Sequence, residues 1–251
     1  MNQFEQFQAA LDLTKVSDSV FSFTPDSRYF VGNTPHGGYL LALMNKAMVQ
    51  ALPHSSAINS NVYYLDRTEP EPAELHVEVL RTSRGSSMGQ VKLIQNKKIT
   101  CLYSSLCSDF EYMKGYSGLS TPLPPIINAV KQDDFKVMSY ESLGSGSTPS
   151  FIKQLNMSVH PDHAWWDREI STDAAEARCS AYLELQGGIA DTFVLSYLAD
   201  ILPPVVQNKY GPLGWIPTLA LTCNIRQLPQ TNLLFIDGLA KDISNGYFEQ
   251  D

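Results

Sequence analysis

The sequence predicts an α+β fold made of two copies of one unit, each an antiparallel sheet curled around a single buried helix. Two observations carry this prediction. A glycine pair followed by an almost wholly apolar helical run occurs twice, with the runs ending at residues 52 and 202. Strand-like segments follow both runs in the same order, and corresponding pieces lie roughly 150 to 160 residues apart, a separation that suits a duplicated domain.

The first helical run begins within Asn33-Thr-Pro-His-Gly-Gly-Tyr39 and continues to Leu52. Apolar residues cover most of its circumference, so it is predicted to be a buried helix over residues 37–52. Gly37 and Gly38 have no Cβ, so a ligand or another backbone can approach the free N–H groups of the helix start. A thioester carbonyl or a phosphate could bind there. The alternative is a glycine turn that only leads into a core helix.

The second helical run is predicted over residues 191–202, with Asp191 as its N-cap. Prolines follow both runs and end them, because the residue before a proline is disfavoured in the α region. A helix that is apolar on nearly all sides has to be wrapped by its sheet. The sheets are expected from strands at residues 58–65 and 73–80 in the first half and 215–225 and 232–239 in the second.

Segments rich in Gly, Ser and Pro, at residues 115–125 and 143–150, mark the join between the two units. The predicted organisation is therefore an N-terminal unit over residues 1–114, a linker over 115–150 and a C-terminal unit over 151–251.

Composition excludes several classes of function. With 251 residues and 43% hydrophobic content, the chain can bury two small fused cores. The net charge of -8 argues against a nucleic-acid partner. There is neither an apolar run of membrane-spanning length nor a signal-peptide pattern, so we expect a cytoplasmic protein with no membrane partner. We also expect a homo-oligomer. The four cysteines lack C-x-x-C spacing and are expected to be buried thiols rather than disulfides or metal ligands.

Three further patterns each have a structural and a functional interpretation. A basic stretch without any acid is either a solvated hairpin or a binding site for a phosphorylated group, and contains Arg81, Arg84, Lys92, Lys97 and Lys98. Residues 85–89 match G-x-S-x-G, but a strand follows them where a nucleophile elbow needs a helix, so a hairpin turn is predicted. His160 and His163 flank a proline, and a loop is favoured over a metal site.

Asp200 is the strongest candidate for chemistry. In the last turn of an apolar helix, the helix dipole and the loss of water both disfavour a carboxylate. The same terms make the carboxylate a stronger base, which suits activation of a water molecule. On the strand that follows, Thr218 and Thr222 lie on one face by alternation, and either hydroxyl could hold that water. The alternative role for Asp200 is a salt bridge or a hydrogen bond to a loop N–H.

Three segments in this order resemble the thioesterase-like superfamily related to acyl-CoA thioesterase II. They are Pro35-His-Gly-Gly-Tyr39, Leu195-Ser-Tyr-Leu-Ala-Asp200 and Gly214-Trp-Ile-Pro-Thr218 with the residues up to Thr222. The resemblance covers nearly the whole chain and implies a double hotdog fold, with hydrolysis of acyl-CoA that uses no metal, no cofactor and no covalent serine. In that family an Asp, a Thr or Ser and a Gln bind the attacking water. Asp200 matches the Asp and Thr218 the hydroxyl residue, with Thr222 as the alternative if the strand register differs.

The resemblance is incomplete at the family's Gln, which has no match here; Gln250 does not replace it. The repeat likewise indicates that the second half ends before an equivalent of the strand at residues 99–107. We assign substrate binding to His36, Gly37, Gly38, Arg81 and Arg84. N–H groups near Gly37-Gly38 or Gly187-Gly188 are expected to polarise the thioester carbonyl.

Two other functions stay open at this point. A hotdog acyl-CoA hydratase or dehydratase would need an Asp and His pair at the start of the helix, and the sequence around His36 offers no acid nearby. A non-catalytic protein that binds acyl-CoA or another lipid-like ligand would account for the missing Gln.

Overall fold

The computed structural model describes residues 1–251 except 121–129, 145–147, 168 and 171–175. Every strand pairing in the described part of the chain is antiparallel. The larger sheet has seven strands in the order β1-β2-β6-β7-β8-β5-β12. Its strands are β1 (Thr14–Lys15), β2 (Val20–Phe23), β6 (Ala73–Thr82), β7 (Ser87–Gln95), β8 (Lys98–Ser108), β5 (Ser56–Tyr64) and β12 (Ala220–Asn224).

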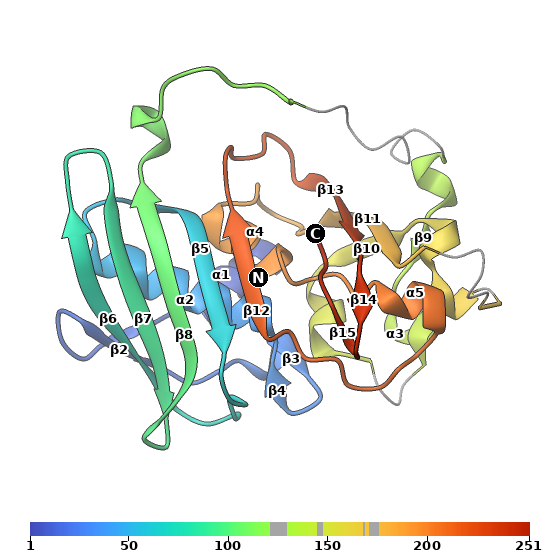
Figure 1. The fold of residues 1–251 in the computed structure, drawn as a ribbon, viewed down its shortest axis with the longest axis horizontal. Helices are drawn as coiled ribbons and strands as arrows, with labels where there is room; N and C mark the ends of the chain where they lie inside the picture. Colours follow the sequence, from blue (N-terminus) through green and yellow to red (C-terminus); the bar gives the residue numbers. More distant parts are fainter. Residues whose placement is uncertain (121–129, 145–147, 168, 171–175) are drawn as a thin grey trace.

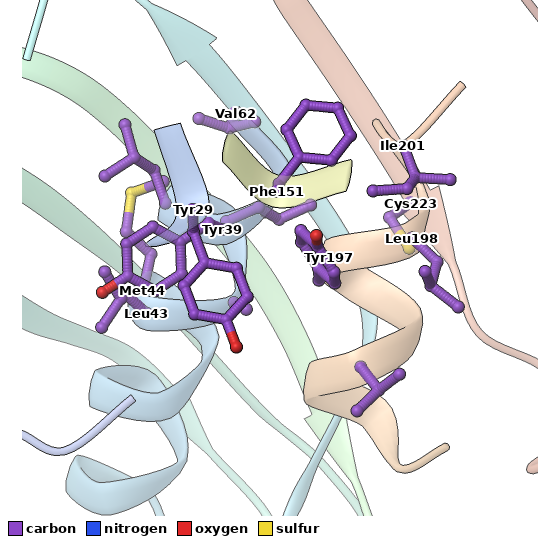
Figure 2. Packing of buried hydrophobic residues seen from close by; sticks show 14 of the residues in the cluster. Tyr29, Tyr39, Leu43, Met44, Val62, Phe151, Tyr197, Leu198, Ile201 and Cys223 are labelled. Carbon is purple, nitrogen blue, oxygen red and sulfur yellow. The ribbon is translucent and has the colours of Figure 1, made fainter. Parts of the chain in front are cut away.

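Helix α2 (Gly37–Ala51) packs on one face of this sheet, against β5, β6, β7 and β8 (Figure 1). All of its residues from Gly38 to Asn45 are buried, as the sequence predicts for a helix that is apolar on nearly all sides. The prediction of a central helix in the first unit is confirmed. Tyr39 and Met44 of α2 are fully buried and pack among the other core residues (Figure 2).

The second half repeats the arrangement with fewer strands. Its sheet has the order β13-β11-β10-β9, built from β9 (Lys136–Val137), β10 (Asn156–Val159), β11 (Arg178–Glu184) and β13 (Leu233–Leu239). Helix α4 (Thr192–Leu198) packs against α2. Because β9 pairs with β10, part of the segment predicted as a linker contributes a strand to this sheet.

Helix α4 is shorter than predicted, and Asp200 lies just beyond it rather than in its last turn. After the cap residue Ala199, the N–H groups of Asp200 and Ile201 reach back three residues, to the carbonyls of Tyr197 and Leu198. The chain therefore leaves the α-helix in a tighter turn before the two prolines at 203 and 204.

Strand β12 belongs to the second half of the sequence but joins the first sheet. It pairs with β5 from Ala220 opposite Tyr63 to Asn224 opposite Asn59 (Figure 1). The strand starts at Ala220 rather than at the predicted residue 215. Pro217, which lies between these two positions, has no N–H to donate to a neighbouring strand. β2 pairs with β6 in the first half, just as β11 pairs with β13 in the second. In the described residues β12 and β13 lie in different sheets, whereas the corresponding strands of the first half, β5 and β6, lie in the same sheet.

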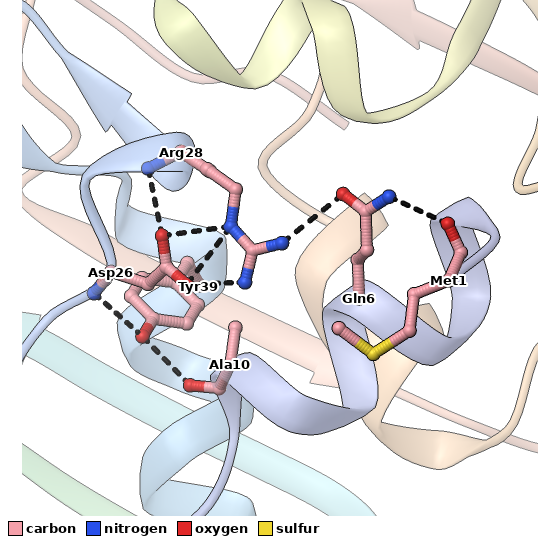
Figure 3. A network of polar contacts seen from close by, with 6 residues as sticks. All are labelled: Met1, Gln6, Ala10, Asp26, Arg28 and Tyr39. Carbon is pink, nitrogen blue, oxygen red and sulfur yellow. Dashed lines mark hydrogen bonds and ion pairs between the residues drawn. The ribbon is translucent and has the colours of Figure 1, made fainter.

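Helix α1 (Gln3–Ala10) packs against residues of both halves. Its Phe7 is fully buried and packs against the rings of Tyr29 and Tyr197. A polar network around Arg28 fixes the same region (Figure 3): Arg28 bonds to the carboxylate of Asp26 and to Gln6 on α1. The N–H of Asp26 donates to the hydroxyl of Tyr39 on α2. The start of α2 is therefore held from several sides.

The remaining elements are short. They are β3 (Phe30–Val31), β4 (Thr34–Pro35), α3 (Tyr140–Leu143), α5 (Val206–Tyr210), β14 (Ile243–Ser244), β15 (Tyr247–Phe248) and several short 3-10 helices. All four cysteines are free and buried, as predicted. Across the part of the chain that the structure describes, no helix has the length and apolar character needed to cross a membrane.

Candidate active site

The site lies where the N-terminus of α2 meets the C-terminal end of α4. The N–H of Gly38 donates to Asp200 Oδ2 at 3.1 Å, a contact across 162 residues of sequence. This approach requires glycine. A Cβ on Gly37 would lie 2.5 Å from Asp200 Oδ2, and a Cβ on Gly38 would lie 3.0 Å from the Tyr197 carbonyl carbon and closer still to its oxygen. The glycine pair predicted to admit a ligand or a backbone admits the end of α4.

The second oxygen of Asp200 is held by Thr218. The Thr218 hydroxyl donates to Asp200 Oδ1 at 2.9 Å, from the segment that immediately precedes β12. Thr222, the alternative partner in the sequence analysis, donates instead to Asn61 Oδ1 at 2.9 Å within the β5–β12 pair. The structure thus brings Thr218 to Asp200 and leaves Thr222 outside the site. The side chain of Asp200 is 16% exposed, so water can reach the carboxylate.

His36 contacts Asp200 from the other side. Its Nε2 lies 2.9 Å from the main-chain oxygen of Asp200 and 3.6 Å from Oδ2, and only 6% of its side chain is exposed. The ring packs against those of Phe151 and Tyr197. Burial lowers the pKa of His36, although the negative charge of Asp200 acts in the opposite direction. Buried in this way, His36 faces the carboxylate residue rather than an open substrate surface.

Tyr64 is a site residue that the sequence reasoning missed. Its hydroxyl donates to the carbonyl of Gly37 at 2.7 Å. Burial, together with the nearby negative charge of Asp200, raises the pKa of Tyr64 well above its ordinary value, so the hydroxyl stays a neutral donor. Its position at the end of the predicted strand 58–65 was the available signal, but the sequence does not show that this strand end lies under the glycine pair.

Only part of the predicted set of carbonyl-polarising N–H groups is available. The N–H of Gly38 is used by Asp200, which leaves the N–H of Gly37 as the candidate at the start of α2. The pair Gly187–Gly188 packs against the start of α1, because a Cβ on Gly187 would collide with Asn2 and one on Gly188 with Phe4. Polarisation of the carbonyl by N–H groups near this second pair stays a prediction.

The predicted basic stretch is divided between two ends of the sheet. Arg81 and Arg84 lie at the β6–β7 turn, where His54, just beyond the C-terminal end of α2, contacts the Arg84 carbonyl at 3.3 Å. The 15 residues of α2 span about 22 Å, so these arginines are roughly one helix length from Asp200. Lys97 and Lys98 lie at the β7–β8 turn, the end of the sheet that holds Tyr64.

The other patterns singled out in the sequence are structural. Residues 85–89 form a hairpin turn and the start of β7, as predicted, and Ser87 is fully buried with its hydroxyl 2.7 Å from His54 Nδ1. His163 is buried and accepts the N–H of Ser180 at 3.0 Å through Nδ1. Gln250 accepts the N–H of Val205 and does not contact Asp200 in the structure.

Sequence models of known families identify the chain. The model of the acyl-CoA thioesterase N-terminal domain matches residues 25–107, and that of the acyl-CoA thioesterase C-terminal domain matches residues 131–251. The chain belongs to the acyl-CoA thioesterase family. The enzyme is therefore a thioester hydrolase, and the family implies a small-molecule acyl-CoA substrate.

Solved structures show that this thioesterase has the hotdog fold. A protein of unknown function with a hot dog fold from Alicyclobacillus acidocaldarius is 17% identical, with a TM-score of 0.80 over 98% of this chain and 89% of that one. The TesB protein of Mycobacterium avium subspecies paratuberculosis is 16% identical, with a TM-score of 0.69 over 97% and 88%. The acyl-CoA thioesterase II TesB2 of Mycobacterium marinum is 13% identical, with a TM-score of 0.68 over 96% and 86%. No curated protein sequence matches the chain.

Proposed function

We propose that this thioesterase hydrolyses acyl-CoA to a free acid and coenzyme A, with Asp200 as the general base that activates water. The observation that carries the proposal is the way the Asp200 carboxylate is held. Gly38 donates to one oxygen and Thr218 to the other, while the side chain keeps a solvent-exposed part. A carboxylate fixed at both oxygens and still open to water is suited to proton abstraction.

The two hydrogen bonds leave acceptor positions of Asp200 for a bound water. An ionised carboxylate has about four acceptor positions, and the two hydrogen bonds use two of them. A water molecule can donate to a remaining position on Asp200. Because the Thr218 proton is directed at Asp200, the Thr218 oxygen is left to accept a hydrogen bond from the same water.

The reaction then balances without a covalent enzyme intermediate. Asp200 takes a proton from water as the water oxygen forms a bond to the thioester carbon. The carbon–sulfur bond breaks, the sulfur leaves with the electron pair, and the proton held by Asp200 returns to the sulfur to give the thiol. We assign polarisation of the carbonyl oxygen to the N–H of Gly37, at the positive end of the α2 dipole.

The pairing of His36 with Asp200 also bears on the hydratase alternative, since the structure supplies an acid beside the histidine that the sequence alone does not show. His36 Nε2 is nevertheless directed at the Asp200 main-chain oxygen. The pair therefore offers one accessible base, as hydrolysis requires, rather than a separate acid and base on the substrate. The cytoplasmic location and the homo-oligomeric state stay predictions, to be measured by fractionation and sedimentation.

The test is to measure hydrolysis of a panel of acyl-CoAs by the Asp200→Asn variant, with release of the free thiol as the readout. The amide oxygen can accept from the N–H of Gly38 and the amide nitrogen can donate to the Thr218 oxygen, so both contacts are retained with the second reversed in direction, but the amide is not a base. We expect kcat to fall by on the order of a hundredfold or more with little change in unfolding temperature. Thr218→Val should lower kcat by about tenfold, whereas the matched control Thr222→Val should not.

Normal turnover by Asp200→Asn would show that another group activates the water. Binding of acyl-CoA by the wild-type protein without turnover would favour the ligand-binding alternative.

A further inference from the structure

His36 occupies a helix N-cap position but does not cap the helix. Its side chain makes no hydrogen bond to the N–H groups of α2. It reaches instead to the other half of the chain, where Nε2 lies 2.9 Å from the main-chain oxygen of Asp200. Residues with short oxygen-bearing side chains are the usual N-caps, so the presence of a buried histidine here calls for another explanation.

The hydrogen bond determines where the proton of His36 is. A carbonyl oxygen can only accept, so Nε2 must carry the hydrogen. The other ring nitrogen, Nδ1, is buried without a hydrogen-bond partner. A charged imidazolium would carry a second N–H, on Nδ1, that is buried and unpaired, and this cost opposes the attraction of the Asp200 carboxylate, so the ring is neutral with hydrogen on Nε2.

The main chain of Asp200 has little other support. Asp200 follows the end of α4, and its N–H reaches the Tyr197 carbonyl at a long 3.5 Å. The His36 bond therefore fixes the Asp200 carbonyl. Without this bond residue 200 could shift away from the start of α2, and the carboxylate would move away from the N–H of Gly38 and the hydroxyl of Thr218.

We propose that His36 is a positioning residue, which uses Nε2–H to clamp the main-chain oxygen of Asp200 and so aims the carboxylate at its water. This role rests on the proposed hydrolysis. His36 does not act on the substrate, because Nε2 is already engaged and the ring is buried. It differs from the direct binding role that the sequence predicted.

Two amide substitutions test the clamp. In His36→Gln the amide nitrogen is the same number of bonds from Cα as Nε2 and can restore the donor. In His36→Asn the nitrogen takes the place of Nδ1 and cannot reach Asp200. Both variants lose the aromatic contact with Phe151, so they control for each other's packing. The measurements are kcat and KM for an acyl-CoA, the unfolding temperature, and the 15N chemical shifts of the His36 ring in the wild-type protein.

We expect His36→Asn to lower kcat by about tenfold to a hundredfold while KM changes by less than about threefold. His36→Gln should keep kcat within about threefold of the wild type, and the 15N shifts should show a neutral ring protonated at Nε2. Equal kcat in the two variants, or losses that follow the unfolding temperature alone, would overturn the proposal, as would a ring protonated at Nδ1. A wild-type enzyme that does not hydrolyse acyl-CoA would instead refute the proposed function, whatever the ring shifts show.

Discussion

Gly38→Ala is the substitution for which the structure makes the sharpest prediction. In an ordinary helix, alanine in place of glycine stabilises by about 1 kcal/mol. At this position the new methyl would lie 3.0 Å from the Tyr197 carbonyl carbon, closer to the carbonyl oxygen, and 3.1 Å from the Asp200 Cβ. Two of these neighbours are backbone atoms, which cannot rotate away as a flexible side chain would.

The size of the effect follows from the distance that must be regained. An ordinary contact begins at 3.4 Å, so the end of α4 has to retreat from α2 by roughly 1 Å. Overpacking of this kind destabilises by about 1 to 3 kcal/mol, which exceeds the helix-propensity gain. A displacement of about 1 Å at a reacting group can lower turnover about a hundredfold, and here it would separate Asp200 from the N–H of Gly38.

The assay compares three variants by chemical unfolding and by thiol release. Gly38→Ala should lose both stability and turnover. Gly37→Ala should lose turnover with a smaller loss of stability, because its methyl would meet side-chain atoms of Asp200 and Tyr64 that can move. Gly85→Ala, where the space around the new methyl is open, is the control and should change neither. A Gly38→Ala enzyme that is about 1 kcal/mol more stable and fully active would refute the role given to this close approach.

The remaining predictions concern charge. Reversal of Lys97 and Lys98 to Glu should weaken coenzyme A binding more than reversal of Arg81 and Arg84, because the lysines lie at the Tyr64 end of the sheet. Titration calorimetry at two salt concentrations measures the affinity of each variant, and the loss of affinity should be smaller at high salt. Equal affinity in all variants would identify the stretch as a solvated hairpin. Burial lowers the pKa of His163 from 6.5 to about 4, so the unfolded chain binds a proton before the folded one as the pH falls below 6.5. The contribution of His163 should therefore make the free energy of unfolding about 2 to 3 kcal/mol lower at pH 4.5 than at pH 7. Urea titrations at the two pH values should show a smaller difference in His163→Asn, whose side-chain oxygen can still accept the N–H of Ser180.

The central helix of the first unit could be predicted from the sequence because its cause is local. A helix that is apolar on nearly all sides must be covered, and the alternating strands after it supply the cover. The sheet to which β12 belongs could not be predicted in this way. Strand pairing depends on which edge is free in three dimensions, and the free edge that β12 takes is that of β5, more than 150 residues earlier.

The site divides in the same manner. Asp200 could be singled out from the sequence because an acid at the end of an apolar helix is locally unfavourable. By alternation Thr218 and Thr222 lie on the same face of the predicted strand. Which of the two contacts Asp200 depends on where β12 begins. The contacts of His36 and Tyr64 could not be predicted, because they arise only where the two halves meet.

The duplication places a second polar residue at the position in α2 that corresponds to Asp200. Asn45 follows the N-cap His36 by nine positions, and Asp200 follows the N-cap Asp191 by nine. Each side-chain oxygen accepts a hydroxyl from a later segment, Ser60 for Asn45 and Thr218 for Asp200.

The surroundings of these two positions differ, and this difference determines what each can do. Asn45 is fully buried and also bonds to Tyr103 and Ser196, so its polar atoms are satisfied inside the core. A carboxylate there would be a buried charge without a cation, which is strongly unfavourable. Only at the end of α4, where the chain leaves the helix and water has access, can the same arrangement of helix and hydroxyl hold an ionised base.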